Sequence, residues 1–277
     1  MNAVTLRTWI RDTRARLPQP LRDEAPALLI FAVVLLLSAW LFYEVVEDMV
    51  WNDPMVHADT ATYAVLQSLR NPVLDRIMIT ITELGDAAVV WALAIAAALY
   101  LAWRRSWRAL LYWLAAVGGG SLINTAIKLA MHRARPGDLH YAGASVFSFP
   151  SGHSTTNAAL YGFLIVLIAR EVPLRHRAPI AAAAILFVAL IAFSRLYLGA
   201  HWLSDVAGGL AFAGVWISLL SLFYTWHHIG RPAKPVHPYG LLAVVCATLV
   251  LVGGAHILLS HTTDLIRYAP YHPAPHT

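Results

Sequence analysis

Long runs of apolar residues constrain the fold of this chain more than any other feature. Segments such as LLIFAVVLLLSAWLF and AAAAILFVALIAF carry no charge and do not alternate between polar and apolar residues. About 20 apolar residues in a helix cross a hydrocarbon core about 30 Å thick, whereas a membrane β-strand alternates over about 10 residues. The runs therefore predict membrane-spanning α-helices.

Composition supports this prediction. Only 13% of the 277 residues are charged and the mean hydropathy is +0.61, whereas about a quarter of the residues in a soluble domain are charged. We expect an all-α, polytopic transmembrane helical bundle with seven spans, at residues 25–43, 87–103, 110–130, 155–169, 179–198, 203–226 and 241–260. The first run is expected to remain as a span, because no small-residue cleavage site follows it.

The chain shows no internal repeat and no stretch that would build a soluble domain. We divide it into an Arg-rich N-terminal segment (1–24), a six-span core (25–226), a connection with the seventh span (227–262) and a disordered tail (263–277). Residues 44–86 predict a helix at the membrane interface that leads into the second span. The GGGS sequence at 118–121 predicts close helix packing rather than a loop.

Basic residues are distributed unevenly between the two sides of the predicted bundle. Thirteen Lys and Arg lie in the N-terminal segment and in the connections after spans two, four and six, and seven lie elsewhere. Because short cytoplasmic connections are enriched in Lys and Arg, we expect a cytoplasmic N-terminus in a bacterial inner membrane. The net charge of +5 does not indicate nucleic-acid binding, since the basic residues flank spans rather than form one patch.

Polar stretches on the less basic side carry the residues suited to chemistry. The first is KLAMHRARP, in which Lys128 and Arg135 are seven residues apart. Seven residues are two helical turns, so both cations are expected on one face of a helix that Pro136 ends. Two cations aimed at one place suit an anion with several oxygens.

The second stretch, SFPSGHSTT, predicts a turn that leads into the N-terminus of a helix. Ser151 is a candidate cap, and Gly152 allows close approach to the backbone. A helix N-terminus presents unpaired N–H groups and the positive end of the helix dipole, so it attracts phosphate. His153 would stand beside such an anion.

The third stretch, SRLYLGAHWLSD, contains Arg195, His201 and Asp205. His201 and Asp205 are one helical turn apart, so the carboxylate could fix the tautomer of the imidazole. Gly199 is expected to break the helix and allow Arg195 to point into the same cavity as His201. Each stretch alone could be structural, as a snorkelling cation, a buried ion pair or a helix cap. Their expected position at one membrane face favours a site, because ionisable groups in membranes are costly and usually functional.

These three stretches resemble the type 2 phosphatidic acid phosphatase family, whose pattern is K-x6-R-P, P-S-G-H and S-R-x5-H-x3-D. The match is complete at 128–136, 150–153 and 194–205. The resemblance implies a six-helix phosphatase core, with the seventh span and the N-terminal segment outside it. It implies a phosphohistidine mechanism with catalytic residues His201, His153 and Asp205, and with phosphate-binding residues Lys128, Arg135, Ser151, Gly152 and Arg195. No metal or other cofactor is expected.

The sequence is also compatible with several alternatives. A zinc hydrolase could use His153, His201 and Asp205 as ligands, but adjacent cations would repel the metal. A serine hydrolase could use Ser151 or Ser154 with a histidine and Asp205, but the chain has no G-x-S-x-G elbow. Vanadium haloperoxidases share the site residues but are soluble. A lipid phosphotransferase, or a lipid-headgroup binding or transport protein, would use the same residues.

The predicted topology places the site at the extracytoplasmic face, where a lipid phosphate could enter laterally. Undecaprenyl pyrophosphate, phosphatidylglycerophosphate, phosphatidic acid and lipid A phosphates are compatible substrates. The sequence does not predict an oligomeric state.

Overall fold

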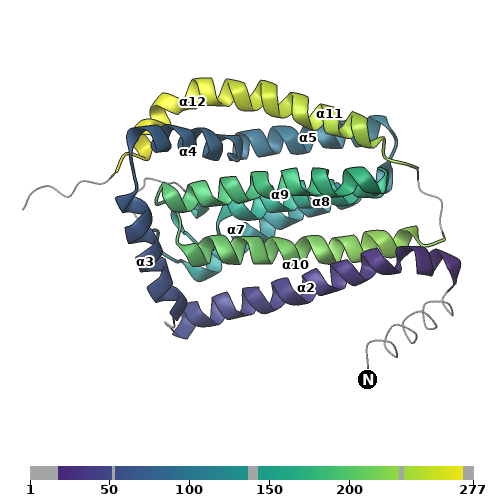
Figure 1. Cartoon of the computed structure of the whole chain (residues 1–277), viewed down its shortest axis with the longest axis horizontal. Helices are drawn as coiled ribbons and strands as arrows, with labels where there is room; N and C mark the ends of the chain where they lie inside the picture. The colour runs from purple at the N-terminus through teal and green to yellow at the C-terminus, as the bar shows by residue number, and fades with distance from the viewer. Residues whose placement is uncertain (1–17, 52–53, 137–142, 231–233, 271–277) are drawn as a thin grey trace, which may run out of the picture.

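The structure, a computed structural model, describes residues 18–51, 54–136, 143–230 and 234–270. Every regular element within these ranges is a helix, and the long helices run side by side (Figure 1). Seven of them are long and apolar enough to cross a membrane: Gln19–Trp51, Pro72–Trp103, Trp107–Met131, Gly152–Ala169, Leu174–Tyr197, Leu203–His228 and Pro238–Arg267. The predicted all-α transmembrane bundle and the order of its spans are confirmed.

Four spans are single helices, and three are built from shorter segments. The single helices are α2 (Gln19–Trp51), α8 (Gly152–Ala169), α9 (Leu174–Tyr197) and α10 (Leu203–His228). The second span joins α4 (Pro72–Leu84) to α5 (Ala87–Trp103). The third joins α6 (Trp107–Leu114), the π-helical turn η1 (Ala115–Gly119) and α7 (Gly120–Met131). The seventh joins α11 (Pro238–Thr248), the π-helical turn η3 (Leu249–Gly253) and α12 (Gly254–Arg267).

Residues 44–86 form more than the single interfacial helix expected from the sequence. Helix α3 (Pro54–Ser68) crosses one end of the bundle, and α4 is part of the second span itself (Figure 1). Local sequence explains the start of α4, because the side chain of Asn71 accepts hydrogen bonds from the backbone N–H groups of Val73 and Leu74. Asp86 caps α5 in the same way, so the second span is interrupted at Gly85 and Asp86.

Helix α10 packs between α2 and α8, and α11 and α12 cover α5 and α4 (Figure 1). The main core is apolar and includes the fully buried side chains of Trp113, Leu160 and Phe163. Close packing also explains GGGS, since a Cβ atom on Gly119 would lie 2.8 Å from the ring of Trp216. The expectation of close helix packing at this sequence is confirmed.

The polar connections gather at the end of the bundle that α3 covers. Residues 132–136 and 143–151, the latter including the 3-10 turn η2 (Gly143–Val146), lie there, as do residues 198–202 and the end of α12 (Figure 1). The seventh span extends beyond its predicted end, because α12 remains helical to Arg267 and Tyr268 is buried. The predicted start of a disordered tail at residue 263 is therefore wrong. Residues 271–277, like residues 1–17, lie outside the described ranges.

Candidate active site

A cavity of about 610 Å³ opens at this end of the bundle. Six of the residues singled out in the sequence line it: Lys128, Arg135, Gly152, His153, Arg195 and His201. They come from α7, the connection after α7, the start of α8, the end of α9 and the turn before α10. The structure therefore brings the three polar stretches together around one space, as expected. Ser151 and Asp205 are completely buried beside it.

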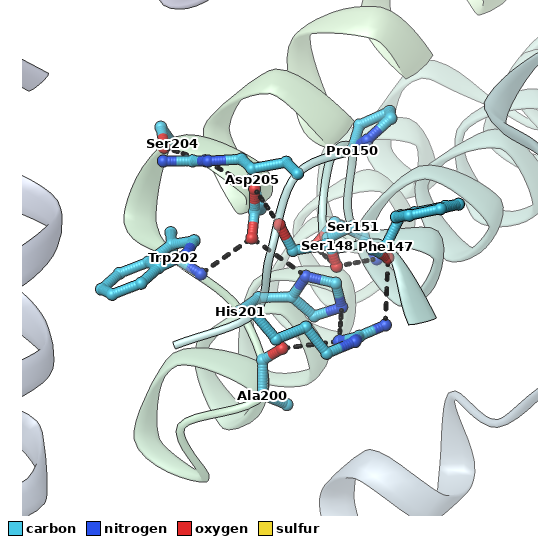
Figure 2. A network of polar contacts seen from close by, with 12 residues as sticks. Phe147, Ser148, Pro150, Ser151, Ala200, His201, Trp202, Ser204 and Asp205 are labelled. Atoms are coloured by element: carbon cyan, nitrogen blue, oxygen red, sulfur yellow. Dashed lines mark hydrogen bonds and ion pairs between the residues drawn. The ribbon is translucent and has the colours of Figure 1, made fainter. Parts of the chain in front are cut away.

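His201 lies in the short turn between α9 and α10. Gly199 has a φ of +68°, a left-handed conformation that suits glycine, and it ends the helical course of α9. The imidazole of His201 then lies between two partners, with Nδ1 3.3 Å from Asp205 Oδ2 and Nε2 3.0 Å from Arg135 Nη1 (Figure 2). Because arginine can only donate, Nε2 must be the acceptor. Nδ1 then carries the proton, which it donates to Asp205.

Burial lowers the pKa of His201 well below its ordinary value, and the charges of Arg135, Arg195 and Lys128 lower it further. His201 is only 3% exposed, which agrees with a dominant contribution from burial. The imidazole is therefore neutral at neutral pH. A neutral imidazole with one protonated nitrogen is the form of histidine that can act as a nucleophile or a base.

Asp205 is held by several donors in addition to His201. Its Oδ2 accepts the backbone N–H of Trp202 at 2.9 Å, and its Oδ1 accepts from Arg133 Nη1 at 2.6 Å and from Ser148 Oγ at 3.3 Å (Figure 2). A buried carboxylate that accepts this many hydrogen bonds has a fixed orientation. Asp205 therefore fixes both the tautomer and the position of His201.

Arg133 and Asp59 complete this network, and neither was predicted from the sequence. Arg133 Nη2 lies 2.6 Å from Asp59 Oδ2, so the guanidinium bridges two buried carboxylates. Asp59, on α3, also accepts the backbone N–H of Ser204 at 2.8 Å and the Ser204 hydroxyl at 2.6 Å. The signal in the sequence for Arg133 was its position two residues before Arg135. Its partner is 74 residues away along the chain, and no local pattern shows that pairing.

Lys128 and Arg135, the cations of the first stretch, both line the cavity, but they do not lie on one helix as predicted. Helix α7 ends at Met131 because His132 has a left-handed φ of 48°. Lys128 and Arg135 are therefore not on one face of a continuous helix, and that part of the prediction is wrong. Lys128 Nζ donates to the carbonyl oxygens of Phe147 and Ser148 at 2.7 and 3.2 Å. Arg135 donates to the carbonyl of Ala200 at 2.6 Å (Figure 2).

Arg195, the third cation, lies at the end of α9 with 1% of its surface exposed. Its Nη1 lies 2.8 Å from Thr82 Oγ1 and 2.9 Å from the Tyr268 hydroxyl. These contacts come from α4 and from the residue that follows α12, so the second and seventh spans both orient this side chain. The sequence predicted the side chain but neither of these partners.

The start of α8 fits the prediction only in part. Ser151 is the N-cap, and its hydroxyl accepts the N–H of Ser154 at 3.4 Å. Its own backbone N–H donates to the carbonyl oxygen of Asp205 at 3.0 Å, so it is not available to a bound phosphate. The phosphate-binding role that the resemblance implies for Ser151 therefore has no free backbone N–H to support it in this arrangement. Gly152 and His153 do line the cavity, where first-turn N–H groups have no helical acceptor.

Within the described ranges, no group of three or more His, Cys, Asp or Glu side chains has an arrangement that could hold a metal ion. The residues of the zinc alternative do not form such a group, since Asp205 is turned toward Arg133, Trp202 and Ser148. The positive charge in the cavity comes from side chains. Four cations, Lys128, Arg135, Arg195 and Arg267, line it with two imidazoles. Such a lining suits an anion that has several oxygens and a reactive centre.

The fold and this cavity define a multi-pass helical membrane protein with a cationic, two-histidine site at one end. The family model described as the PAP2 superfamily matches residues 109–229. The chain is also 30% identical over 178 residues to phosphatidylglycerophosphatase B of Bacillus subtilis (strain 168), covering 63% of this chain and 87% of the relative. This chain belongs to the PAP2 superfamily.

Two further comparisons agree with this assignment. A lipid A 1-phosphatase of Rhizobium johnstonii is 37% identical over 136 residues, which is 46% of this chain and 50% of that protein, so the chain spans about half the length of that relative. The crystal structure of a transmembrane PAP2 type phosphatidylglycerolphosphate phosphatase from Bacillus subtilis superposes with a TM-score of 0.58 at 28% identity. That match covers 72% of this chain and 96% of the other.

Proposed function

We propose that this protein is an integral membrane lipid phosphatase that hydrolyses a phosphomonoester or diphosphate of a lipid through a phosphohistidine on His201. The observation that carries the proposal is the shared cavity of Lys128, Arg135, Arg195, His153 and His201. Membership of a phosphatase superfamily and relatives named for lipid phosphates support it.

In the first step, Nε2 of His201 attacks phosphorus while the bond to the leaving oxygen breaks. Nδ1–H remains bonded to Asp205, which stabilises the charge that develops on the imidazole. The N–H of Arg135 that points at Nε2 must turn to a phosphate oxygen, since Nε2 now needs its lone pair for phosphorus. Substrate binding therefore exchanges one acceptor of Arg135 for another.

His153 acts as the general acid and then as the general base. The imidazolium form of His153 gives its proton to the leaving oxygen in the first step, and the neutral imidazole that results takes a proton from water in the second. The water oxygen bonds to phosphorus, the N–P bond breaks, and inorganic phosphate leaves with His201 neutral again. One imidazole is thus the nucleophile and the other moves the protons.

Lys128, Arg135 and Arg195 supply the positive charge that phosphoryl transfer needs. The reaction depends mostly on positioning and on neutralising the equatorial oxygens, which magnesium does in many other enzymes. We propose that these cations replace it and that turnover needs no metal. Gly152 allows the substrate phosphate to approach the start of α8.

The proposed substrates are lipids whose phosphate can reach the cavity from the bilayer. Undecaprenyl pyrophosphate, phosphatidylglycerophosphate, phosphatidic acid and lipid A phosphates fit this description, and the names of the relatives support such lipids. We place the protein in a bacterial inner membrane with the N-terminus in the cytoplasm and the cavity on the extracytoplasmic face. The excess of Lys and Arg at the opposite end supports this orientation.

A phosphate-release assay over this set of lipids, with and without EDTA, tests the proposal. His201→Ala is expected to lower kcat by about four orders of magnitude, because a nucleophile that acts with its base as a unit is lost. His176→Ala, at the opposite end of the bundle, serves as the control and should retain activity. Phosphate release by the His201 variant at the native rate, or complete loss of native activity in EDTA, would contradict the proposed mechanism.

A further inference from the structure

We propose that the seventh span is part of the active site, because Tyr268 is a positioning residue for the phosphate-binding Arg195. This inference rests on the proposed function, in which Arg195 contacts the substrate phosphate. It assigns a role to a part of the chain that lies beyond the match to the family model, which ends at residue 229.

The contact between the two side chains is close and buried. The Tyr268 hydroxyl lies 2.9 Å from Arg195 Nη1, and the guanidinium carbon is 5.4 Å from the centre of the Tyr268 ring. Tyr268 is 4% exposed and Arg195 1%. A hydrogen bond to a charged group and a cation–π contact in the same pair restrict the rotamers that Arg195 can adopt.

The chemistry of these partners suits a cation that must remain able to bind an anion. Arg195 Nη1 donates to two hydroxyl oxygens, those of Tyr268 and Thr82. A hydroxyl is neutral, so it orients the guanidinium without cancelling its charge. A carboxylate at the same two positions would compete with the substrate phosphate for Arg195.

Tyr268 is itself fixed in place from two directions. Its backbone carbonyl accepts a hydrogen bond from Arg70 Nη2, and Arg70 is held by Asp75 at 2.6 and 3.1 Å. Its ring belongs to a small buried cluster that we call the site cluster, which consists of Ile79, Tyr197, Leu198, Ala200 and Tyr268. Two of these residues lie in the turn that carries His201, so the end of the seventh span packs directly behind that turn.

The neighbouring residue supports the same role for this span. Arg267, the last residue of α12, lines the cavity. Thr82 and Tyr268 both lie outside residues 109–229. Arg195 therefore lies within the segment that matches the family model, and its hydroxyl partners Thr82 and Tyr268 lie outside that segment.

Tyr268→Phe tests the inference, with inorganic phosphate as the probe in competition with a lipid substrate. The substitution removes only the hydroxyl, so the packing of the site cluster is retained. We expect the inhibition constant of phosphate to rise about tenfold and kcat/KM to fall by a similar factor, the scale of one hydrogen bond to a charged group. The control is Tyr100→Phe, which removes a hydroxyl that donates to the carbonyl of His237 at the other end of the seventh span. That control should keep the native inhibition constant, and both variants should unfold at similar temperatures.

A second measurement in an Arg195→Ala background separates the possible results. If Tyr268 acts through Arg195, adding Tyr268→Phe to Arg195→Ala should produce no further rise in the inhibition constant. A rise of the full factor in that background would overturn the inference. So would an unchanged constant for Tyr268→Phe alone beside a raised one for Arg195→Ala, and the proposed function would then remain. An unchanged constant for Arg195→Ala would instead overturn the phosphate-binding role on which the inference rests.

Discussion

His201 Nε2 is the atom proposed to attack phosphorus, and Arg135 Nη1 points at it from 3.0 Å. This arrangement holds the free enzyme in the required tautomer, because the donor on Nε2 leaves the proton on Nδ1 beside Asp205. In the proposed mechanism, Arg135 must also change acceptor when substrate binds. The same side chain therefore affects both the protonation of the nucleophile and the binding of the phosphate.

A pH profile tests this residue pair. Burial and then the charge of Arg135 lower the pKa of His201 below 6.5, so the neutral nucleophile should persist as the pH falls through that value. We expect Arg135→Gln to raise the pKa and to move the acidic limb of kcat/KM to higher pH on the residual activity. Measuring both proteins with one substrate cancels the ionisation of the substrate itself. An acidic limb that does not move would contradict the proposed coupling.

The lowered pKa of His201 also makes the stability of the folded protein depend on pH. The folded pKa of His201 lies below the unfolded value near 6.5, so the unfolded chain binds the extra proton first as the pH falls. The contribution of His201 to stability is therefore present above pH 6.5 and decreases below it.

At the residue scale, the sequence predicted the side chains that line the cavity but not the residues that hold them. Lys128, Arg135, His153, Arg195 and His201 stand at spacings that indicate a site, and they line one cavity. The partners Asp59, Thr82, Arg133, Ser148 and Tyr268 come from connections and helices far apart in the chain. Such pairings depend on tertiary packing, which local spacing does not contain.

The contact between helices α8 and α10 brings His153 and His201 to the same cavity. The Ser151 N–H donates to the carbonyl of Asp205, and Thr155 Oγ1 lies 3.2 Å from the carbonyl of Gly209. A Cβ atom on Gly209 would lie 3.0 Å from the Ser151 carbonyl oxygen. Gly209 therefore permits the close approach that places His153 of α8 opposite His201 before α10.

Gly209→Ala is expected to push these helices apart. Overpacking of this kind costs about 1–3 kcal/mol, so the apparent unfolding temperature in detergent should fall. Activity should fall at least about tenfold, because small displacements of catalytic groups are costly. The control is Gly118→Ala, since a Cβ atom there would meet nothing within 4 Å. Equal unfolding temperatures and activities for the two variants would contradict this role for Gly209.

Helix boundaries show where element-level prediction fails. Hydropathy located all seven spans, because each contains a long apolar segment. It placed the end of the seventh span too early, since polar residues such as Asp264 are buried against α4 rather than left in water. It placed the end of the third span at residue 130, one residue before α7 ends at Met131. The expected continuation of that helix to Pro136 was wrong, because His132 has a left-handed backbone.

At the scale of the whole molecule, the orientation in the membrane decides which side meets the substrate. Cys246 is the single cysteine, so a Cys246→Ser parent accepts new cysteines one at a time. We expect a membrane-impermeant maleimide to label Ala269→Cys, an exposed position two residues after the cavity-lining Arg267, in intact spheroplasts. Arg108→Cys, at the opposite end, should react only after the membrane is opened. The reverse pattern would contradict an extracytoplasmic site.

The central claim is that His201 carries the phosphoryl group during turnover, in a pocket assembled from all three polar stretches. The most direct measurement mixes the protein with a lipid substrate labelled at phosphorus and quenches the reaction in alkali, in which phosphohistidine survives. The account predicts one labelled histidine, His201, and no label in His201→Ala. Turnover with no labelled protein at any time, or with the label on a different residue, would contradict it.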